Sequence, residues 1–460
     1  MPGASVPGWL RMELDAEVRR FSGGRTLFGG SPLRVVRLSD CGATLLDRWL
    51  AGEPIGDAGA AAALARRLLD IGFVHPISDA GAAMFTPADV TLVVPVKDDA
   101  AGLARLLAHV GPVAARLIVD DGSRPPLTAA ALRHPVARGP AAARETGWRR
   151  ATTEFIAFLD ADVVPQQGWL EGLLPLFDDP AVAAVAPRVH GSFEAGHGSG
   201  GVLPAAIARY EDRRSSLDMG TRPGVVRPLS TLGYVPSAAL VVRRSALAEV
   251  GGFDERLRFG EDVDLVWRLT DAGYLVRYQP AVTVRHRPRA TLRAWLRQRF
   301  DYGSSAAPLA ARHPDRLSPA VVQPWSAVIW MLVAARRPIP AVVLAIATTA
   351  RAKRALCRRG LPPATALTVA ATGHLTAGRA LASAVRRTWW PFMMPTRMGR
   401  RALLLSVAPP VAEALVRRAS LPDVLLRIAD DVAYSAGVWA GCLRHREPAP
   451  LLPRTPRQSK

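Results

Sequence analysis

Short apolar runs, each followed by glycine, proline or acidic residues, recur through the middle of the chain. They cover residues 90–96, 116–119, 155–159, 182–187 and 239–242. Each run is rich in β-branched, aromatic or small apolar residues and has no polar face, which is typical of strands buried on both sides. Amphipathic segments between them predict helices, one of them over 169–177. The alternation of strand and helix indicates an α/β domain with a mostly parallel, Rossmann-like sheet flanked by helices.

A different pattern precedes this domain. Residues 33–38 follow a Gly-Gly-Ser-Pro turn and predict the return strand of a hairpin. One helix is predicted after a cap at Ser39 or Asp40, and a second over 58–71, ending at Gly72. We therefore expect residues 1–88 to form a small winged-helix-like domain. Such domains recognise nucleic acids or peptides, although the segment could equally serve only to pack against its neighbour.

The C-terminal third is apolar and basic. Its apolar runs at 320–335 and 338–350 are separated by two arginines, and each is shorter than the roughly twenty residues that span a bilayer. A basic segment and an aromatic stretch at 389–394 follow, as at membrane interfaces. We expect residues 311–460 to be a helical region that associates with the cytoplasmic face of the membrane and ends in a disordered tail from Glu447. A buried helical subdomain of a cytoplasmic protein is the alternative.

Composition narrows the class of partner. The chain has 460 residues, 49% of them hydrophobic and 21% charged, which suits two or three globular domains. Its formal net charge of +20 favours anionic partners: nucleic acid, phosphorylated ligands or an acidic membrane. The three cysteines have neither metal-ligand spacing nor the density of a disulfide framework. The N-terminus lacks the basic and apolar pattern of a secretory signal, so we expect a reducing, cytosolic setting.

Two aspartates end the strand at 155–159. Alternate residues of an extended segment point the same way, so the carboxylates of Asp160 and Asp162 can face one point beyond the sheet. Hard oxygen ligands suit Mg²⁺ or Mn²⁺ that is shared with substrate phosphates. His286, which follows another short strand, is a candidate third ligand. The alternatives are a polar turn and an exposed loop histidine.

Further polar residues lie at neighbouring strand ends and helix starts. Asp120 and Asp121 precede a glycine and a serine, where a carboxylate can accept from a uracil N–H or a ribose hydroxyl. Arg144 lies one turn into a helix that opens with proline, an arrangement that suits a diphosphate, although an isolated helix arginine usually faces solvent. Asp262 lies at or beside a helix N-cap, and capping alone would explain it. The glycine-rich stretch 190–201 predicts a loop that could close on a substrate.

The order and spacing of these motifs over about residues 90–300 resemble the family 2 inverting glycosyltransferases, which have the GT-A fold. Val94-Pro95-Val96 resembles the first strand of that family, Asp120-Asp121-Gly122-Ser123 its nucleotide-binding turn, and Gly260-Glu261-Asp262 the segment with its catalytic base. The resemblance implies a glycosyltransferase domain over 89–310, with site residues of three kinds. They are Pro95, Asp120, Asp121, Arg144 and Asp160 for the nucleotide sugar, Asp160, Asp162 and His286 for the metal, and Asp262 with Glu261 for catalysis.

The resemblance also implies a single displacement. A metal on Asp162 would neutralise the diphosphate leaving group. Asp262 would take the proton from an acceptor hydroxyl as this attacks the anomeric carbon from the opposite face. An α-linked donor would then give a β-linked product.

Within the family, the stretch Arg297-Gln298-Arg299-Phe300-Asp301-Tyr302-Gly303 resembles the glycosyltransferases of mycofactocin biosynthesis. This resemblance implies UDP-glucose as donor and premycofactocin, a peptide-derived redox cofactor precursor, as an acceptor that is extended by β-linked glucoses. The stretch departs from the Gln-x-x-Arg-Trp of processive members, which argues against polymer extrusion. A membrane-associated transferase that acts on a lipid or cell-envelope glycan stays open. A nucleic-acid-binding protein also stays open, since it would explain the charge and the winged-helix outline. It would not explain acids at successive strand ends, which repel phosphate backbones unless a metal intervenes.

Overall fold

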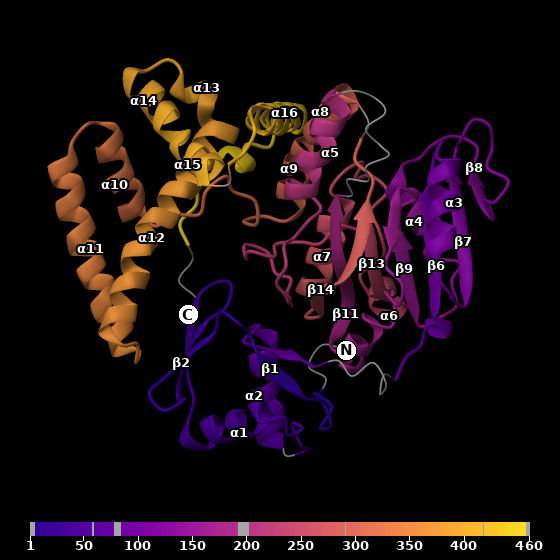
Figure 1. Cartoon of the computed structure of the whole chain (residues 1–460), viewed down its shortest axis with the longest axis horizontal. Coiled ribbons are helices and arrows are strands. Elements are labelled where there is room, and N and C mark those ends of the chain that lie inside the picture. Colours follow the sequence, from indigo (N-terminus) through magenta and orange to yellow (C-terminus); the bar gives the residue numbers. More distant parts are fainter. Residues whose placement is uncertain are drawn as a thin grey trace. The chain divides into compact units, whose positions relative to one another are not determined.

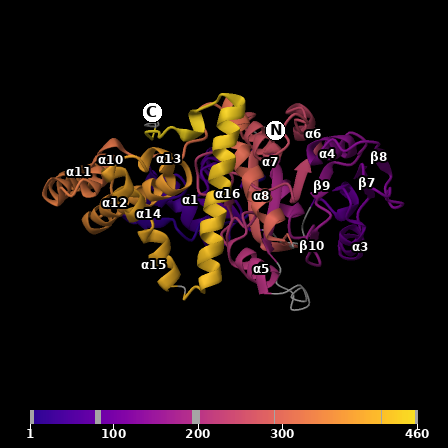
Figure 2. The same cartoon turned by 90° about the horizontal axis from the view of Figure 1, so that it is seen from above.

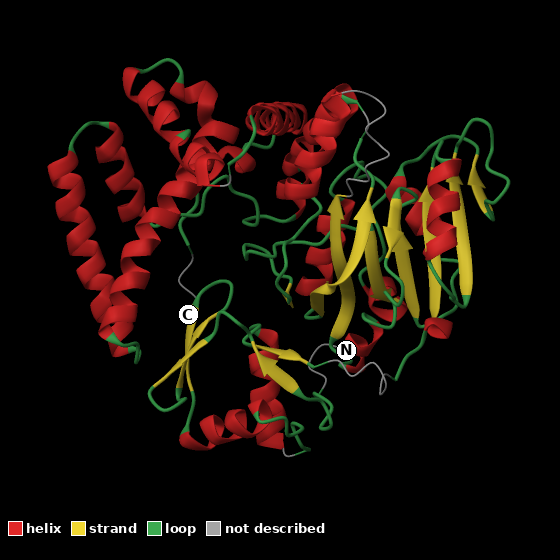
Figure 3. Ribbon diagram, viewed as in Figure 1, coloured by secondary structure: helices red, strands yellow, loops and turns green. Residues whose placement is uncertain are grey.

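The computed structural model describes residues 5–456, apart from residues 58, 78–83, 192–201, 290 and 417 (Figure 1, Figure 3). The glycine-rich loop predicted at 190–201 therefore lies almost entirely outside the described residues. The chain separates into two compact units, residues 1–19 with 27–290 and residues 20–26 with 291–460.

A nine-stranded sheet forms the centre of the first unit. Its strands lie in the order β10 (Val163–Pro165), β14 (Leu275–His286), β11 (Val182–Gly191), β13 (Ala239–Arg243), β9 (Phe155–Leu159), β6 (Val90–Val96), β7 (Ala115–Asp121) and β8 (Leu132–His134), and β12 (Gly224–Val225) pairs with β14. Strands β9, β6, β7 and β8 run parallel, as do β11 and β14. Strand β13 is antiparallel to both of its neighbours. The predicted α/β fold class is confirmed, and the antiparallel pairs lie in the part of the sheet between β10 and β9, including β12.

Helices and 3-10 turns connect these strands. They are η1 (Pro87–Asp89), α3 (Ala100–His109), α4 (Pro140–Trp148), η2 (Leu174–Asp178), α5 (Val202–Arg214), α6 (Arg244–Glu249) and α7 (Glu261–Asp271). The run at 155–159 is buried at every position, as its lack of a polar face predicted. Helix α4 begins after Gly139, whose φ of 101° favours glycine, and has proline in its first turn.

Two local predictions in this unit were wrong. The segment 169–177 was expected to be an amphipathic helix but forms turns and the short η2. Its apolar side chains are buried as expected, but Pro175 lacks an N–H to continue a helix, and Gly172 packs closely against Val282. The sequence also predicts two short strands, over 274–278 and 281–285, but the structure has one strand, β14, with irregular register against β11.

The N-terminal segment has the predicted outline of a hairpin and two helices. Its elements are β1 (Met12–Leu14), β2 (Arg19–Phe21), β3 (Thr26–Gly29), β4 (Arg34–Arg37), α1 (Asp40–Leu50), α2 (Gly59–Asp70) and β5 (Val74–Pro76). The Ser39 hydroxyl accepts from the Gly42 N–H and caps α1, and Gly72, with φ of 72°, follows α2. Strands β1 and β5 pair antiparallel. Leu46, Leu68 and Phe73 are fully buried in the core of this segment.

The second unit is helical. It contains α8 (Leu292–Ser304), α9 (Ala306–Arg312), α10 (Pro324–Ala334), α11 (Pro338–Arg358), α12 (Pro363–Ala384), η4 (Val385–Trp389), α13 (Trp390–Met393), α14 (Arg397–Ser406), α15 (Ala408–Val416), α16 (Leu421–His445) and η5 (Ala449–Leu451). The predicted apolar runs become α10 and α11. Among the described residues, no helix is both long and apolar enough to cross a membrane.

The limits of this unit differ from those we expected. Helices α8 and α9 pack against α16, so the unit begins at residue 291 rather than 311 (Figure 2). Gly437 and Gly441 of α16 touch the backbone of α8 at Phe300 and Ser304, an approach that a Cβ atom would prevent. Disorder from Glu447 was also predicted wrongly for residues 447–456. They form η5, and a bridge joins Arg454 to Val321, because buried Pro450 anchors the segment.

Candidate active site

Arg144 joins two of the predicted acidic motifs. Its Nη2 donates to Asp160 Oδ1 at 2.6 Å, and its Nη1 donates to Glu261 Oε1 at 2.8 Å. The side chain is only 3% exposed, and the ring of Phe253 lies 5.7 Å from its guanidinium carbon. Burial alone would lower the pKa of Arg144, but the charges of Asp160 and Glu261 raise it above its ordinary value. The guanidinium of Arg144 therefore connects helix α4 to the end of β9 and to the start of α7.

This position differs from the expected diphosphate contact. The pattern of a helix start with an arginine predicted a side chain that faces a ligand, whereas the structure turns Arg144 inward. The reason is the pair of carboxylates behind it, because burying them without a cation would be costly. Arg144 therefore forms ion pairs with Asp160 and Glu261 and compensates their charge.

Glu261 and Asp262 open α7. Gly260 precedes them with φ of 80°, so glycine, and not Asp262, occupies the N-cap. Asp262 Oδ1 accepts from the Val263 N–H at 2.8 Å, and Oδ2 accepts from the Ser237 N–H at 3.3 Å. Asp262 remains partly exposed, whereas its neighbour Glu261 is buried.

Burial raises the pKa of both carboxyl groups. Burial and, secondly, the charge of Asp262 raise the pKa of Glu261 to about 7, although Arg144 acts in the opposite direction. Burial also raises the pKa of Asp262. A general base is most effective when its pKa lies near the working pH, so this pair has the chemistry that proton abstraction requires.

Asp162 faces His286. The Asp162 Oδ2 and His286 Nε2 atoms are 3.5 Å apart, and Arg289 Nη1 lies 3.7 Å from the same oxygen. The pairing of β10 with β14 sets this geometry, because Val163 lies opposite His286. Burial alone would raise the pKa of Asp162, but the charges of His286 and Arg289 bring it below its ordinary value. The sequence placed Asp162 and His286 at the sheet edge, and the structure brings them together.

A three-residue metal site is not formed by the predicted ligands. Within the described residues, no group of three His, Cys, Asp or Glu side chains is placed to hold a metal. Asp160 is held by Arg144 instead, through the 2.6 Å hydrogen bond. Asp162 and His286 still offer a carboxylate and an imidazole side by side, and buried His286 Nδ1 has no partner among the described residues. This donor pair fits a divalent cation whose other ligands are phosphate oxygens and water.

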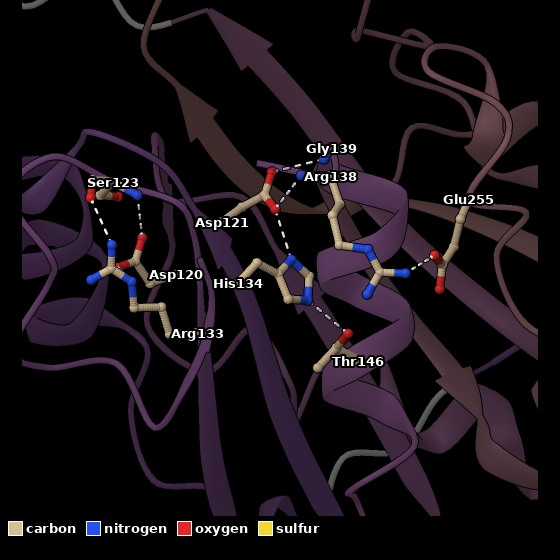
Figure 4. A network of polar contacts seen from close by, with 9 residues as sticks. All are labelled: Asp120, Asp121, Ser123, Arg133, His134, Arg138, Gly139, Thr146 and Glu255. Carbon is tan, nitrogen blue, oxygen red and sulfur yellow. Dashed lines mark hydrogen bonds and ion pairs between the residues drawn. The ribbon is translucent and has the colours of Figure 1, made fainter. Parts of the chain in front are cut away.

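Asp120 shapes the turn after β7. Its Oδ1 accepts from the Ser123 N–H at 2.8 Å, and Arg133 lies 3.7 Å from its Oδ2 (Figure 4). The same Oδ2 accepts from the Leu127 N–H at 3.2 Å. The side chain is fully buried. Burial alone would raise the pKa of Asp120, but these hydrogen bonds bring it below its ordinary value. Asp120 therefore fixes the backbone of the turn.

Asp121 fixes the approach to α4. Its Oδ1 accepts from the Arg138 N–H and its Oδ2 from the Gly139 N–H, each at 2.8 Å, while His134 Nδ1 lies 2.8 Å from Oδ1 (Figure 4). The other ring nitrogen of His134 lies 3.0 Å from the Thr146 hydroxyl. We had expected both aspartates to face a nucleoside, but in this structure their oxygens organise the surrounding loops. Sequence reasoning missed His134, because nothing in the β8 segment marks it as a partner of β7.

Pro95 has a simpler environment. It is buried in β6 and lies opposite Val119 of β7. Its predicted contact with the nucleotide stays a prediction.

The site and fold together define a class of protein. An α/β sheet with acidic residues at successive strand ends and a carboxyl pair at a helix start is the arrangement expected of a GT-A glycosyltransferase. The pattern of the glycosyl transferase family 2 matches residues 91–251.

Similarity to one relative extends over nearly the whole chain. The sequence is 39% identical, over 99% of both chains, to the pre-mycofactocin glycosyltransferase of Mycobacterium tuberculosis strain H37Rv. The chain belongs to the family 2 glycosyltransferases and, within them, to the family of that enzyme.

More distant similarities cover parts of the chain. Glycosyltransferase AglE of Haloferax volcanii is 27% identical over 46% of this chain and 71% of its own. A solved mannosyltransferase from Pyrobaculum calidifontis, in complex with GDP-Man and Mn²⁺, is 19% identical, with a TM-score of 0.42 over 80% of this chain and 90% of its own.

Proposed function

We propose that the protein transfers glucose from UDP-glucose to premycofactocin, a peptide-derived redox cofactor precursor, and builds a β-linked oligoglucose chain. The observation that carries this proposal is the 39% identity to the pre-mycofactocin glycosyltransferase over 99% of the chain, which includes both flanking regions. The donor and the chain-extending activity rest on the sequence resemblance described above.

The reaction proposed is a single displacement with inversion. Asp262 takes the proton from an acceptor hydroxyl, and the resulting oxygen attacks the anomeric carbon. The bond from that carbon to the UDP oxygen breaks, and UDP leaves from the opposite face. The N–H groups of Val263 and Ser237 hold the Asp262 carboxylate in place. Arg144 balances the charge of Glu261 beside it.

A divalent cation, Mg²⁺ or Mn²⁺, fits the donor pair of Asp162 and His286. When bound, it would supply positive charge to the diphosphate. Asp160, close to the same strand end, is then available for the ribose side of the donor while Arg144 orients it.

The test of this function is incubation of the purified protein with UDP-glucose, Mg²⁺ or Mn²⁺, and premycofactocin, followed by mass spectrometry. We expect successive hexose increments on the acceptor. Parallel reactions with a polyprenyl-phosphate acceptor test the alternative, a transferase that acts on a membrane glycan. Hexose on the lipid alone, or on neither acceptor, would reject the proposed acceptor.

We expect Asp162→Ala to weaken the metal-dependent part of UDP binding by about tenfold or more, because the carboxylate that pairs with His286 is lost. The measurement is calorimetric titration of UDP with Mn²⁺ and with EDTA. Asp271→Asn, at the exposed end of α7, is the control. Equal affinities for the wild type and Asp162→Ala in Mn²⁺ would remove Asp162 from the metal site.

We also propose that the protein associates with the cytoplasmic face of the membrane. The end of α15 and the start of α16 expose large apolar side chains, with Leu415 73% and Leu421 70% exposed. Arg400, Arg401 and Arg418 lie in the same stretch of chain. Apolar side chains flanked by arginines suit the interface of an anionic bilayer.

Replacing both leucines, Leu415→Glu with Leu421→Glu, should abolish binding to phosphatidylglycerol-containing vesicles in a sedimentation assay, because two carboxylates would have to enter the interface. Leu33→Glu, at an equally exposed leucine of the N-terminal segment, should bind like the wild type. A wild type that stays in the supernatant would favour the cytoplasmic alternative.

A further inference from the structure

The turn Val250–Phe253, between α6 and α7, is held from two helices. From α7, Arg268 donates to the Val250 carbonyl at 2.5 Å and to the Gly252 carbonyl at 2.7 Å, while Asp264 accepts from Arg268 at 2.8 Å. From α4, Glu145 Oε2 accepts from the Phe253 N–H at 2.8 Å. The turn therefore ties the helix that carries Arg144 to the helix that begins with Glu261.

Glu145 is the buried half of this connection. The residue is 5% exposed, and its Oε2 also accepts from Trp148 Nε1 at 2.6 Å. Arg149 lies 2.6 Å from its other oxygen. Gly252, with φ of 74°, passes so close to the carboxylate that a Cβ atom there would overlap it. A buried carboxylate with several donors holds its neighbours in one arrangement, because any displacement leaves it unpaired.

The connection leads to the carboxyl pair of α7. The Phe253 ring lies 5.7 Å from the Arg144 guanidinium and packs edge-on against Phe158, with ring centres 5.1 Å apart. Arg144 in turn donates to Glu261, the neighbour of Asp262. Glu145 thus fixes the backbone from which Phe253 covers Arg144, and Arg144 places the start of α7.

We propose that Glu145 is a positioning residue for glycosyl transfer, which sets the start of α7 so that Asp262 reaches the acceptor hydroxyl. This inference rests on the proposed role of Asp262 as the base. The contacts described for Glu145 are with Phe253, Trp148 and Arg149, and none of them is with Asp120, Asp160 or Asp162. Its loss should therefore affect turnover rather than donor affinity.

A second contact, an ion pair, joins the start of α4 to the chain just after the Val250–Phe253 turn and provides a matched control. Arg138, just before α4, pairs with Glu255, two residues after Phe253 (Figure 4). Both side chains are exposed. Exposed ion pairs contribute about 0–1 kcal/mol, so Glu255→Ala removes a glutamate from the same turn region at little cost.

The experiment compares Glu145→Ala, Glu145→Gln and Glu255→Ala in the full chain. We expect Glu145→Ala to lower kcat by about tenfold or more, since small displacements of reacting groups are costly, with the KM for UDP-glucose changed less than about twofold. Glu145→Gln should recover most of the loss, because its amide oxygen can still accept from the Phe253 N–H. Glu255→Ala should match the wild type.

Hydrogen–deuterium exchange supplies a readout that does not depend on the acceptor. Glu145→Ala should speed the exchange of residues 250–263 and leave residues 115–123 unchanged. Exchange at 250–263 equal to the wild type, a kcat equal to that of Glu255→Ala, or a rise in donor KM that accounts for the loss would each overturn the proposal. If the wild type transfers no glucose to premycofactocin, the proposed function fails, whereas the exchange data still decide whether Glu145 holds this segment.

Discussion

Asp262→Asn should lower glycosyl transfer by about 10²–10⁴-fold, the usual contribution of a general base, while UDP-glucose binds with near-normal affinity. The asparagine keeps the size of the side chain, and its amide oxygen can still accept from the Val263 N–H, although its NH2 group cannot accept from the Ser237 N–H. It cannot take a proton from the acceptor. The measurements are initial rates by mass spectrometry and donor affinity by calorimetry.

The pH profile sharpens this expectation. Burial raises the pKa of Asp262 and brings that of Glu261 to about 7. Below about pH 7 Glu261 is protonated, and the raised pKa of Asp262 means that it loses its charge at a higher pH than an ordinary aspartate, so wild-type kcat/KM should fall as the pH is lowered. Asp271→Asn, on the same helix, should keep the wild-type rate and profile. Donor affinity lost in parallel with the rate would mean that Asp262 binds the donor and is not the base.

Arg144→Leu should destabilise the fold by about 3–5 kcal/mol, because removing one partner of a buried ion pair leaves the other charged and unpaired. Glu261 is nearly as buried as Arg144, whereas Asp160 is partly exposed and should contribute less. The free energy of unfolding is measured in urea. Arg150→Leu, at an exposed arginine just after α4, should differ little from the wild type.

The loss should depend on pH in a defined direction. Arg144 lowers the pKa of Glu261, so the variant raises that pKa further above its unfolded value. A carboxyl group with a raised folded pKa destabilises the fold where it must be charged and recovers when it can be protonated. The difference between Arg144→Leu and the wild type should therefore be larger at pH 8 than at pH 6. Equal losses at both pH values would show that lost packing, rather than charge, is responsible.

The sheet could be predicted from sequence because its strands are buried on both faces. Runs such as 90–96 and 155–159 leave no polar face, so few other conformations suit them. The same logic placed Asp160, Asp162 and His286 at one edge, since strand ends meet there. Burial was also predicted correctly at 169–177, but the conformation was not, because Pro175 and close packing at Gly172 override the helical period.

The direction of individual side chains could not be predicted in this way. Arg144 has the sequence context of an anion-binding residue, and only the meeting of β9 with α7 turns it inward. Asp121 depends on His134, which arrives from a later strand. Glu145 follows Arg144 directly, yet its partner at Phe253 is more than a hundred residues away, so no local pattern connects them.

The contact between α8 and α16 determines when during synthesis each unit can fold. The last strand of the sheet, β14, ends at His286, so the sheet of the first unit can assemble while the C-terminal helices are still being translated. Helix α8 follows at once, but Gly437 and Gly441, against which it packs, belong to the much later helix α16. The second unit therefore closes only after α16 has been translated. Until then the nascent chain has a folded sheet followed by the basic helix α8, which does not yet have α16 to pack against.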